Sequence, residues 1–161
     1  MKEENKIIII ITAVLISFSG IISCDRAGVY SHAEKIPGYS WDADNIIEFD
    51  PHIEDTESAY DINLVIRSDR SYPYRNLFLF IKTTSPQGIS IKDTLEYYLA
   101  DEKGNWYGSG LGDINALTVP FKNSVMFPLE GTYSFKVRHG MRVEDLEGIT
   151  DIGLHIIKQN K

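Results

Sequence analysis

The strongest constraint on the fold of this chain is a period of two in its apolar residues. Apolar and polar side chains alternate in short segments separated by turn residues, and the clearest segments are residues 47–50, 61–67, 89–99, 133–138 and 151–156. In a half-buried β-strand every second side chain faces the core, whereas no segment keeps a helical period beyond two turns. We therefore predict an all-β protein, an antiparallel β-sandwich that is jelly-roll-like and has about eight or nine strands.

Three segments predict finer features. Residues 77–81 are apolar on both faces, which predicts a central strand covered on both sides. In residues 89–99 the odd positions are apolar except for Asp93. Because a buried carboxylate without a partner is costly, we expect a bulge, a bend or a partner at Asp93. One short helical turn is expected within residues 139–147.

The N-terminus predicts a lipoprotein. An apolar run at residues 7–18 is followed by Ile21-Ile22-Ser23-Cys24, which contains the only cysteine of the chain. This pattern is typical of a bacterial lipoprotein signal, in which the cysteine thiol takes up the lipid and a peptidase cleaves between Ser23 and Cys24. The alternative is an uncleaved membrane helix at residues 7–22, but small and polar residues thin its second half, and the run is shorter than the roughly 20 apolar residues that a spanning helix needs.

These patterns divide the chain into three parts. We expect a signal peptide at residues 1–23, a short tether with the lipidated cysteine at residues 24–28, and one β-sandwich domain at residues 29–161.

Composition excludes some partners and some sources of stability. The formal net charge is −7, which argues against a nucleic-acid partner. With its one cysteine acylated, the chain can form no disulfide, so an apolar core must stabilise the domain.

Three later blocks of the sequence resemble one protein family. Residues 71–79 read Ser-Tyr-Pro-Tyr-Arg-Asn-Leu-Phe-Leu, residues 93–114 run from Asp-Thr-Leu-Glu-Tyr to Trp-Tyr-Gly-Ser-Gly-Leu-Gly-Asp-Ile, and residues 127–154 run from Phe-Pro to Leu-Glu-Gly-Ile-Thr-Asp-Ile-Gly-Leu. Together with the lipoprotein signal, these blocks resemble the GldH family of gliding-motility lipoproteins of the Bacteroidetes, over essentially the whole chain.

The resemblance implies a cellular role and no reaction. Such lipoproteins are needed for cells to glide over surfaces, alongside the envelope motor and the type IX secretion apparatus, and relatives in non-gliding members of the group suggest a wider envelope role. The family brings no catalytic residue and one functional position, the acylated cysteine, which falls on Cys24. We therefore expect a non-enzymatic protein whose partners are the membrane and other gliding or secretion proteins of the envelope.

Localisation follows from the lipid anchor. We favour the outer membrane. The inner membrane stays open as an alternative, because Asp25 directly follows the lipidated cysteine and such a residue retains lipoproteins at the inner membrane in some bacteria.

Aromatic residues carry the main alternative function. Trp41, Tyr72, Tyr74 and Trp106 are candidates for a platform that stacks on sugar rings, which would make the protein a lipid-anchored carbohydrate-binding module. Against this, aromatic side chains in sandwiches more often pack in the core or in loops.

The remaining motifs predict no cofactor and no metal. The glycines of residues 108–112 match neither phosphate-loop nor dinucleotide spacing, the four histidines show no metal-ligand spacing, and the acidic residues after Trp41 lack the EF-hand pattern. Thr94, within Asp-Thr-Leu, matches the short O-glycosylation acceptor pattern of this bacterial group, which makes it a candidate modification site.

Overall fold

The structure is a computed structural model that describes residues 28–159. In this range the chain forms thirteen β-strands and one short 3-10 turn, η1 (Pro37–Tyr39). The strands are β1 (Gly28–Lys35), β2 (Ser40–Asp42), β3 (Ile47–Phe49), β4 (His52–Ile53), β5 (Ala59–Ser68), β6 (Asn76–Thr84), β7 (Ser90–Tyr98), β8 (Ser109–Leu111), β9 (Ile114–Met126), β10 (Gly131–Thr132), β11 (Ser134–His139), β12 (Asp145–Glu147) and β13 (Ile149–Lys158).

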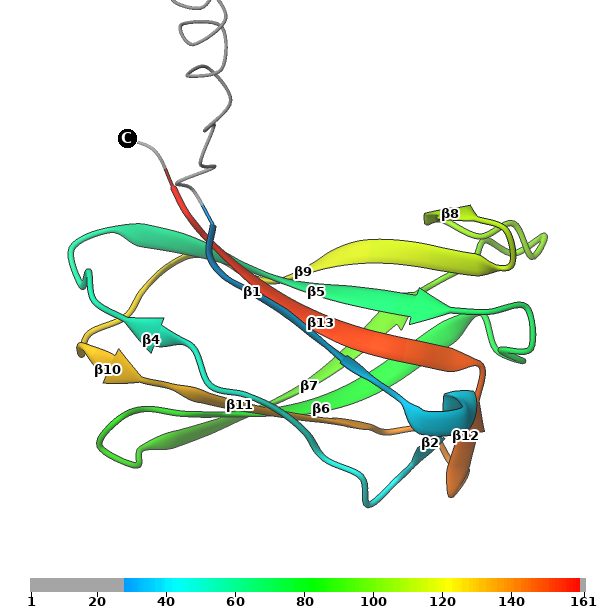
Figure 1. Ribbon diagram of the computed structural model, residues 1–161, viewed down its shortest axis with the longest axis horizontal. Coiled ribbons are helices and arrows are strands. Elements are labelled where there is room, and N and C mark those ends of the chain that lie inside the picture. Colours follow the sequence, from blue (N-terminus) through cyan, green and yellow to red (C-terminus); the bar gives the residue numbers. More distant parts are fainter. Residues whose placement is uncertain (1–27, 160–161) are drawn as a thin grey trace, which may run out of the picture.

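Two antiparallel sheets form the layers of the sandwich (Figure 1). One sheet has the strand order β1-β13-β5-β9-β8, and the other has the order β3-β11-β6-β7. The predicted all-β, antiparallel sandwich is confirmed.

The pairing of the long strands is that of a jelly roll. The first strand pairs with the last, β1 with β13, and the following pairs are β3 with β11, β5 with β9, and β6 with β7. Successive pairs alternate between the two sheets. One long antiparallel ribbon, rolled up so that it crosses from sheet to sheet, gives this arrangement and closes it with eight strands.

The strand count is higher than the eight or nine expected, and the ribbon explains the excess. The pairs β2 with β12 and β4 with β10 lie in sequence between the long pairs, where the ribbon passes from one sheet to the other. They have two or three residues per strand and show no clear alternation, unlike the equally short β3, whose alternation continues to Asp50. The last short strand, β8, pairs with the start of β9.

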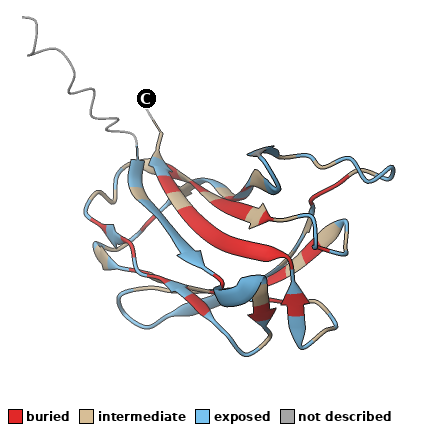
Figure 2. Cartoon of the chain, turned by 45° about the vertical axis from the view of Figure 1, so that its right-hand side comes forward, coloured by how far each residue is buried: buried red, intermediate tan, exposed pale blue. Residues whose placement is uncertain are grey.

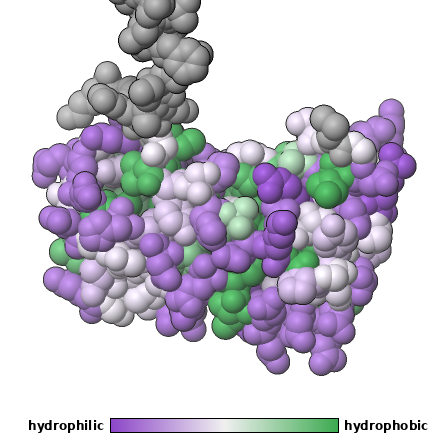
Figure 3. All heavy atoms as spheres, in the orientation of Figure 1, coloured by the Kyte–Doolittle hydropathy of each residue, from purple (hydrophilic) through white to green (hydrophobic). Residues whose placement is uncertain are grey.

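The core lies between the two layers and is centred on β5 and β13. Figure 2 shows β13 buried along most of its length, and Leu64, Ile152, Leu154 and Ile156 have no or almost no exposed surface. Outside this core, the face seen in Figure 3 is mostly hydrophilic, with apolar residues in separate small groups. The apolar core that the lack of a disulfide demanded is therefore present.

Asp93 has the partner that its position requires. Its Oδ1 accepts a hydrogen bond from Lys122 Nζ on β9 at 2.7 Å, and the register between β6 and β7 is regular, with Asp93 opposite Ile81. The expected partner is present, and the alternatives of a bulge or a bend are not observed.

Two expectations about exposure are wrong. The strand β6 is central, between β11 and β7, but it is covered on one side only, since 37% of Phe80 is exposed on the outer face. Ile89 lies just before the edge strand β7 and Ile91 is near its start, and they are 66% and 63% exposed, although they share the alternation of the partly buried Leu95 and Tyr97 that follow. Alternation reports which face a side chain occupies, and it does not report whether another layer covers that face.

The expected helical turn in residues 139–147 is also wrong. This segment ends β11 and forms β12, which pairs with β2. The turn occurs instead at Pro37–Tyr39, where proline starts η1.

Two matched isoleucine truncations test the assignment of the core. Ile66→Ala on β5, where the side chain is 1% exposed, should lower the free energy of unfolding by about 2–5 kcal/mol because it leaves a cavity. Ile91→Ala should cost less than about 1 kcal/mol, since its side chain is mostly in water. Urea unfolding followed by circular dichroism measures both, and equal losses would contradict the layer arrangement.

Candidate functional site

The predicted lipid site lies outside the described residues. Ser23 and Cys24 precede Gly28, the first described residue, which already belongs to β1. Gly28 pairs with Ile157 near the end of the last strand, so the start and the end of the domain lie side by side (Figure 1). A lipid on Cys24 would therefore hold the domain by the β1–β13 end.

Trp41 is a core residue. Its side chain is completely buried, its Nε1 donates a hydrogen bond to the Asn45 carbonyl at 2.9 Å, and its ring packs edge-on against His139 at 5.4 Å. Trp41 therefore presents no surface on which a sugar could stack.

The other three aromatic candidates come together around Tyr72. The Tyr72 ring lies 5.9 Å from Tyr74 and 6.2 Å from Trp106, and its hydroxyl donates to the Asn76 carbonyl at 2.8 Å. Tyr72 is buried, and this burial raises its pKa, while Tyr74 and Trp106 are half-buried. The cluster is thus mainly a packing unit with a partly open rim.

Gly148 lets the chain reach this cluster. Its φ of +87° is in the left-handed region, and a Cβ at this position would lie 2.3 Å from the Tyr72 backbone nitrogen. Only glycine fits both conditions, so the strand β13 can start directly against Tyr72.

The Trp106 rim opens onto a polar depression. A cavity of about 300 Å³ is lined by Trp106, Asp69, Arg70, Asn115 and neighbouring residues, and Arg70 pairs with Asp113 at 3.1 Å between two exposed side chains. Of the four aromatic candidates, Trp106 is the one that lies beside a polar cavity. This arrangement is compatible with carbohydrate binding.

Thr94 is exposed on the outer face of β7, opposite Phe80 of β6. Its hydroxyl is therefore accessible for the predicted modification. Its neighbour Asp93 points to the other face, toward Lys122.

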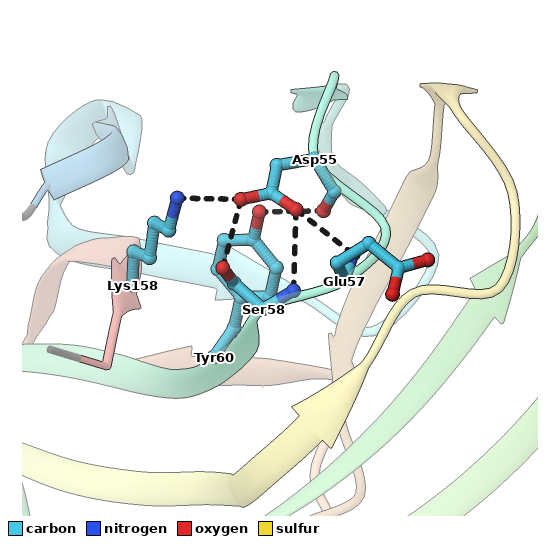
Figure 4. A network of polar contacts seen from close by, with 5 residues as sticks. All are labelled: Asp55, Glu57, Ser58, Tyr60 and Lys158. Carbon is cyan, nitrogen blue, oxygen red and sulfur yellow. Dashed lines mark hydrogen bonds and ion pairs between the residues drawn. The ribbon is translucent and has the colours of Figure 1, made fainter. Parts of the chain in front are cut away.

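Asp55 organises a network that the sequence did not reveal (Figure 4). Its carboxylate accepts hydrogen bonds from Lys158 Nζ at 2.5 Å, from the Ser58 hydroxyl at 2.8 Å and from the Glu57 backbone N–H at 2.8 Å. The Tyr60 hydroxyl donates to the Asp55 carbonyl at 2.7 Å. The network ties the loop before β5 to the end of β13.

The chemistry of this network is structural. Lysine, serine and backbone donors all stabilise the ionised carboxylate and lower the pKa of Asp55, which makes it a weak base toward the Ser58 hydroxyl. A spacing of Asp followed three residues later by Ser suggests a local turn, but the contact with Lys158 depends on the fold.

His139 is the buried histidine of the fold. It is 3% exposed, and neither ring nitrogen has a hydrogen-bond partner in the part of the chain that the structure describes. Desolvation lowers its pKa, and the backbone at Trp41 and Glu144 opposes part of this shift. The lowered pKa favours the neutral form of His139, whose ring packs against Trp41.

Within residues 28–159, no three His, Cys, Asp or Glu side chains gather as a metal site would require. The same residues include no helix that could span a membrane.

The comparisons with known proteins decide the family. A family model described as GldH lipoprotein matches residues 28–156, which is almost the whole jelly roll. The chain belongs to the GldH lipoprotein family. The family expected from the sequence blocks is confirmed.

Two relatives of the GldH family match nearly end to end. The gliding motility lipoprotein GldH homolog of Christiangramia forsetii is 36% identical over 160 residues, covering 95% of this chain and 94% of the relative. The gliding motility lipoprotein GldH of Flavobacterium johnsoniae is 32% identical over 163 residues, covering 97% and 98%.

A solved structure, that of dimeric latent PorU from Porphyromonas gingivalis, aligns with 83% of this chain at 16% identity and a TM-score of 0.33. This chain spans 13% of PorU, and a similarity of this size supports no conclusion about the GldH-family protein.

The pH dependence of stability tests the buried histidine. Since folding lowers the pKa of His139, the unfolded chain binds its proton first, and the free energy of unfolding should fall as the pH drops below the ordinary histidine value of about 6.5. His139→Phe keeps a ring against Trp41 and should flatten this fall between about pH 7 and 5. Urea midpoints at several pH values measure it, with the exposed His52→Phe as control. An unchanged slope in His139→Phe would assign the fall to other groups.

Proposed function

We propose that this GldH-family protein is a lipid-anchored envelope component required for gliding motility, and that it acts by protein contact and without catalysis. The observation that carries the proposal is the family match over residues 28–156, with relatives named gliding motility lipoproteins over nearly the whole chain. The link to the gliding motor and the type IX secretion apparatus belongs to the same proposal and rests on the resemblance.

The anchor is proposed at Cys24, after removal of residues 1–23. Each buried methylene contributes about 0.8 kcal/mol, and one acyl chain alone binds only marginally, so the two or three chains of a bacterial lipoprotein make a stable anchor. From Cys24 to Gly28 an extended chain spans at most about 14 Å. The domain would therefore stay close to the membrane, the outer membrane in our proposal.

A contact role is supported by how the polar groups are used. The Asp55 network joins loop to strand and lowers the pKa of its carboxylate, and Asp93 is neutralised by Lys122 at 2.7 Å. In both cases the charged groups stabilise the fold, as is typical of a protein that acts by contact and not by catalysis.

The second candidate function is a carbohydrate-binding module. The observation that favours it is Trp106, which lines a polar cavity of about 300 Å³ and is braced by Tyr72. Trp106→Ala would abolish binding of a neutral polysaccharide at this cavity, whereas Trp41, being buried, would affect it only through stability.

Replacing the gene by its Cys24→Ala form in a gliding strain tests the main proposal. We expect the loss of gliding on agar with the protein still present, because the chain then lacks the lipid that anchors it in its proper membrane. Ser23→Gly keeps a small residue before the cleaved bond and should preserve acylation and gliding. Normal gliding with an unacylated Cys24→Ala protein would refute the need for an anchor.

The secreted proteome of the same cultures tests the finer part of the proposal. If secreted adhesins disappear together with gliding in Cys24→Ala cells, the protein acts with the secretion apparatus. Loss of gliding with normal secretion would separate it from that apparatus.

A further inference from the structure

A row of lysines crosses the outer face of the sheet β3-β11-β6-β7. Lys136 on β11 lies opposite Lys82 on β6, and Lys82 lies opposite Lys92 on β7. Their sequence neighbours on the other face, such as Val137 and Ile81, are buried in the core. Since neighbouring strands are about 4.8 Å apart, three cationic side chains leave the same face of the sheet side by side.

The next row of this face holds an arginine over an aromatic ring. Arg138 lies opposite Phe80, and its guanidinium carbon is 5.1 Å from the centre of that ring. Gly140 packs against the ring so closely that a Cβ there would be 2.8 Å from it. Gly140 therefore limits the movement of the Phe80 ring, and the guanidinium of Arg138 stacks on that ring. Stacking fixes the plane in which the N–H donors of Arg138 lie.

Two acidic side chains lie on this face, Glu48 on β3 and Glu96 on β7, and Glu96 accepts a hydrogen bond from Asn76 Nδ2 at 2.6 Å. Lys136 pairs with Glu48 at 3.1 Å, but in residues 28–159 no ion pair involves Lys82, Lys92 or Arg138. Like charges directly opposite each other destabilise a sheet. In a chain with a net charge of −7, this basic face is a local exception, and its unpaired cations are available to an anionic ligand.

The same residues border a depression of about 280 Å³. Lys82, Lys92, Lys136 and Arg138 line it together with Phe80 and Ile46, and 37% of Phe80 and 52% of Ile46 are exposed. Ile81, Asp93 and Thr94 complete the lining, and Asp93 is paired with Lys122. A volume near the lower limit of small-molecule sites suits one or two sugar-sized units. The lining offers both cations and apolar contacts.

We propose that this basic face binds an acidic polysaccharide through its carboxylate or phosphate groups. Lys82, Lys92 and Arg138 contact the anions, while Phe80 and Ile46 cover the apolar face of a sugar ring. This site lies on the outer sheet face, so it is distinct from the Trp106 cavity, and it goes beyond the proposed role in gliding.

Two observations favour a saccharide over a peptide or protein partner. The strands β6 and β11, which carry Lys82, Lys136 and Arg138, are both paired on their two sides, so a peptide strand could pair only at the edge strand β7 and away from these three cations. Lysine is depleted from the cores of protein interfaces, whereas a strongly hydrated ammonium suits a flexible, multiply charged chain.

Binding of an oligogalacturonate to the full processed chain in detergent tests the proposal. We expect saturable binding that weakens from about 50 to 200 mM salt and is absent for neutral dextran. The double variant Lys82→Glu, Lys92→Glu should weaken it by on the order of tenfold or more, while Lys103→Glu, in the turn after β7, should leave it unchanged. A phosphorylated mannan in a second arm distinguishes phosphate from carboxylate as the preferred anion.

Lys82→Gln gives a readout that a purely structural lysine would not give. It removes the middle charge of the row, so the thermal midpoint should stay the same or rise while oligogalacturonate binding weakens. A lower midpoint with unchanged binding overturns the proposal. So does tighter binding of poly-glutamate or of phosphatidylglycerol vesicles than of either acidic saccharide, which would assign the face to a protein or to a membrane.

Discussion

The pairing of β13 with both β1 and β5 is the constraint on which the rest of the fold depends. The last long strand lies between the first strand and the core strand β5, and its residues are among the most buried of the chain. Without β13, β1 would have no neighbour and β5 would lose one of its two. The Asp55–Lys158 contact fastens the end of this strand to the loop before β5. The roll therefore closes only after the C-terminus is available, which is the slow, non-local kind of folding.

Much of this fold could be predicted, because its long strands are half-buried. The alternation of Ile62, Leu64 and Ile66 reflects one face on the core, and the structure buries all three. The short strands at the corners of the ribbon could not be predicted, since they show no clear alternation. The exposure of Ile89 and Ile91 could not be predicted either. Their side chains are on the face that packs on the core, but they lie at the start of an edge strand where no layer covers them.

Site residues were harder to predict than strands, because a site depends on register. Tyr72 and Tyr74 are close in sequence, but the contact of Tyr72 with Trp106 requires the fold. Trp41 belongs to the core beside His139. The lysines of the basic face occupy ordinary outward positions in three separate segments. Only the register of β11, β6 and β7 shows that Lys136, Lys82 and Lys92 are neighbours. The acidic composition of the chain gives no sign of a basic face.

The position of the chain start relates the two proposed surfaces. β1 begins at Gly28 in the layer β1-β13-β5-β9, whereas the basic face is the outer surface of the opposite layer, with β11, β6 and β7 (Figure 1). A tether of at most about 14 Å is shorter than the two packed layers with their side chains, because sheets alone pack about 10 Å apart. If the β1 layer lies toward the membrane, the basic face points away from it. In that orientation a polymer bound by Lys82 and Lys92 would come from the compartment that the domain faces.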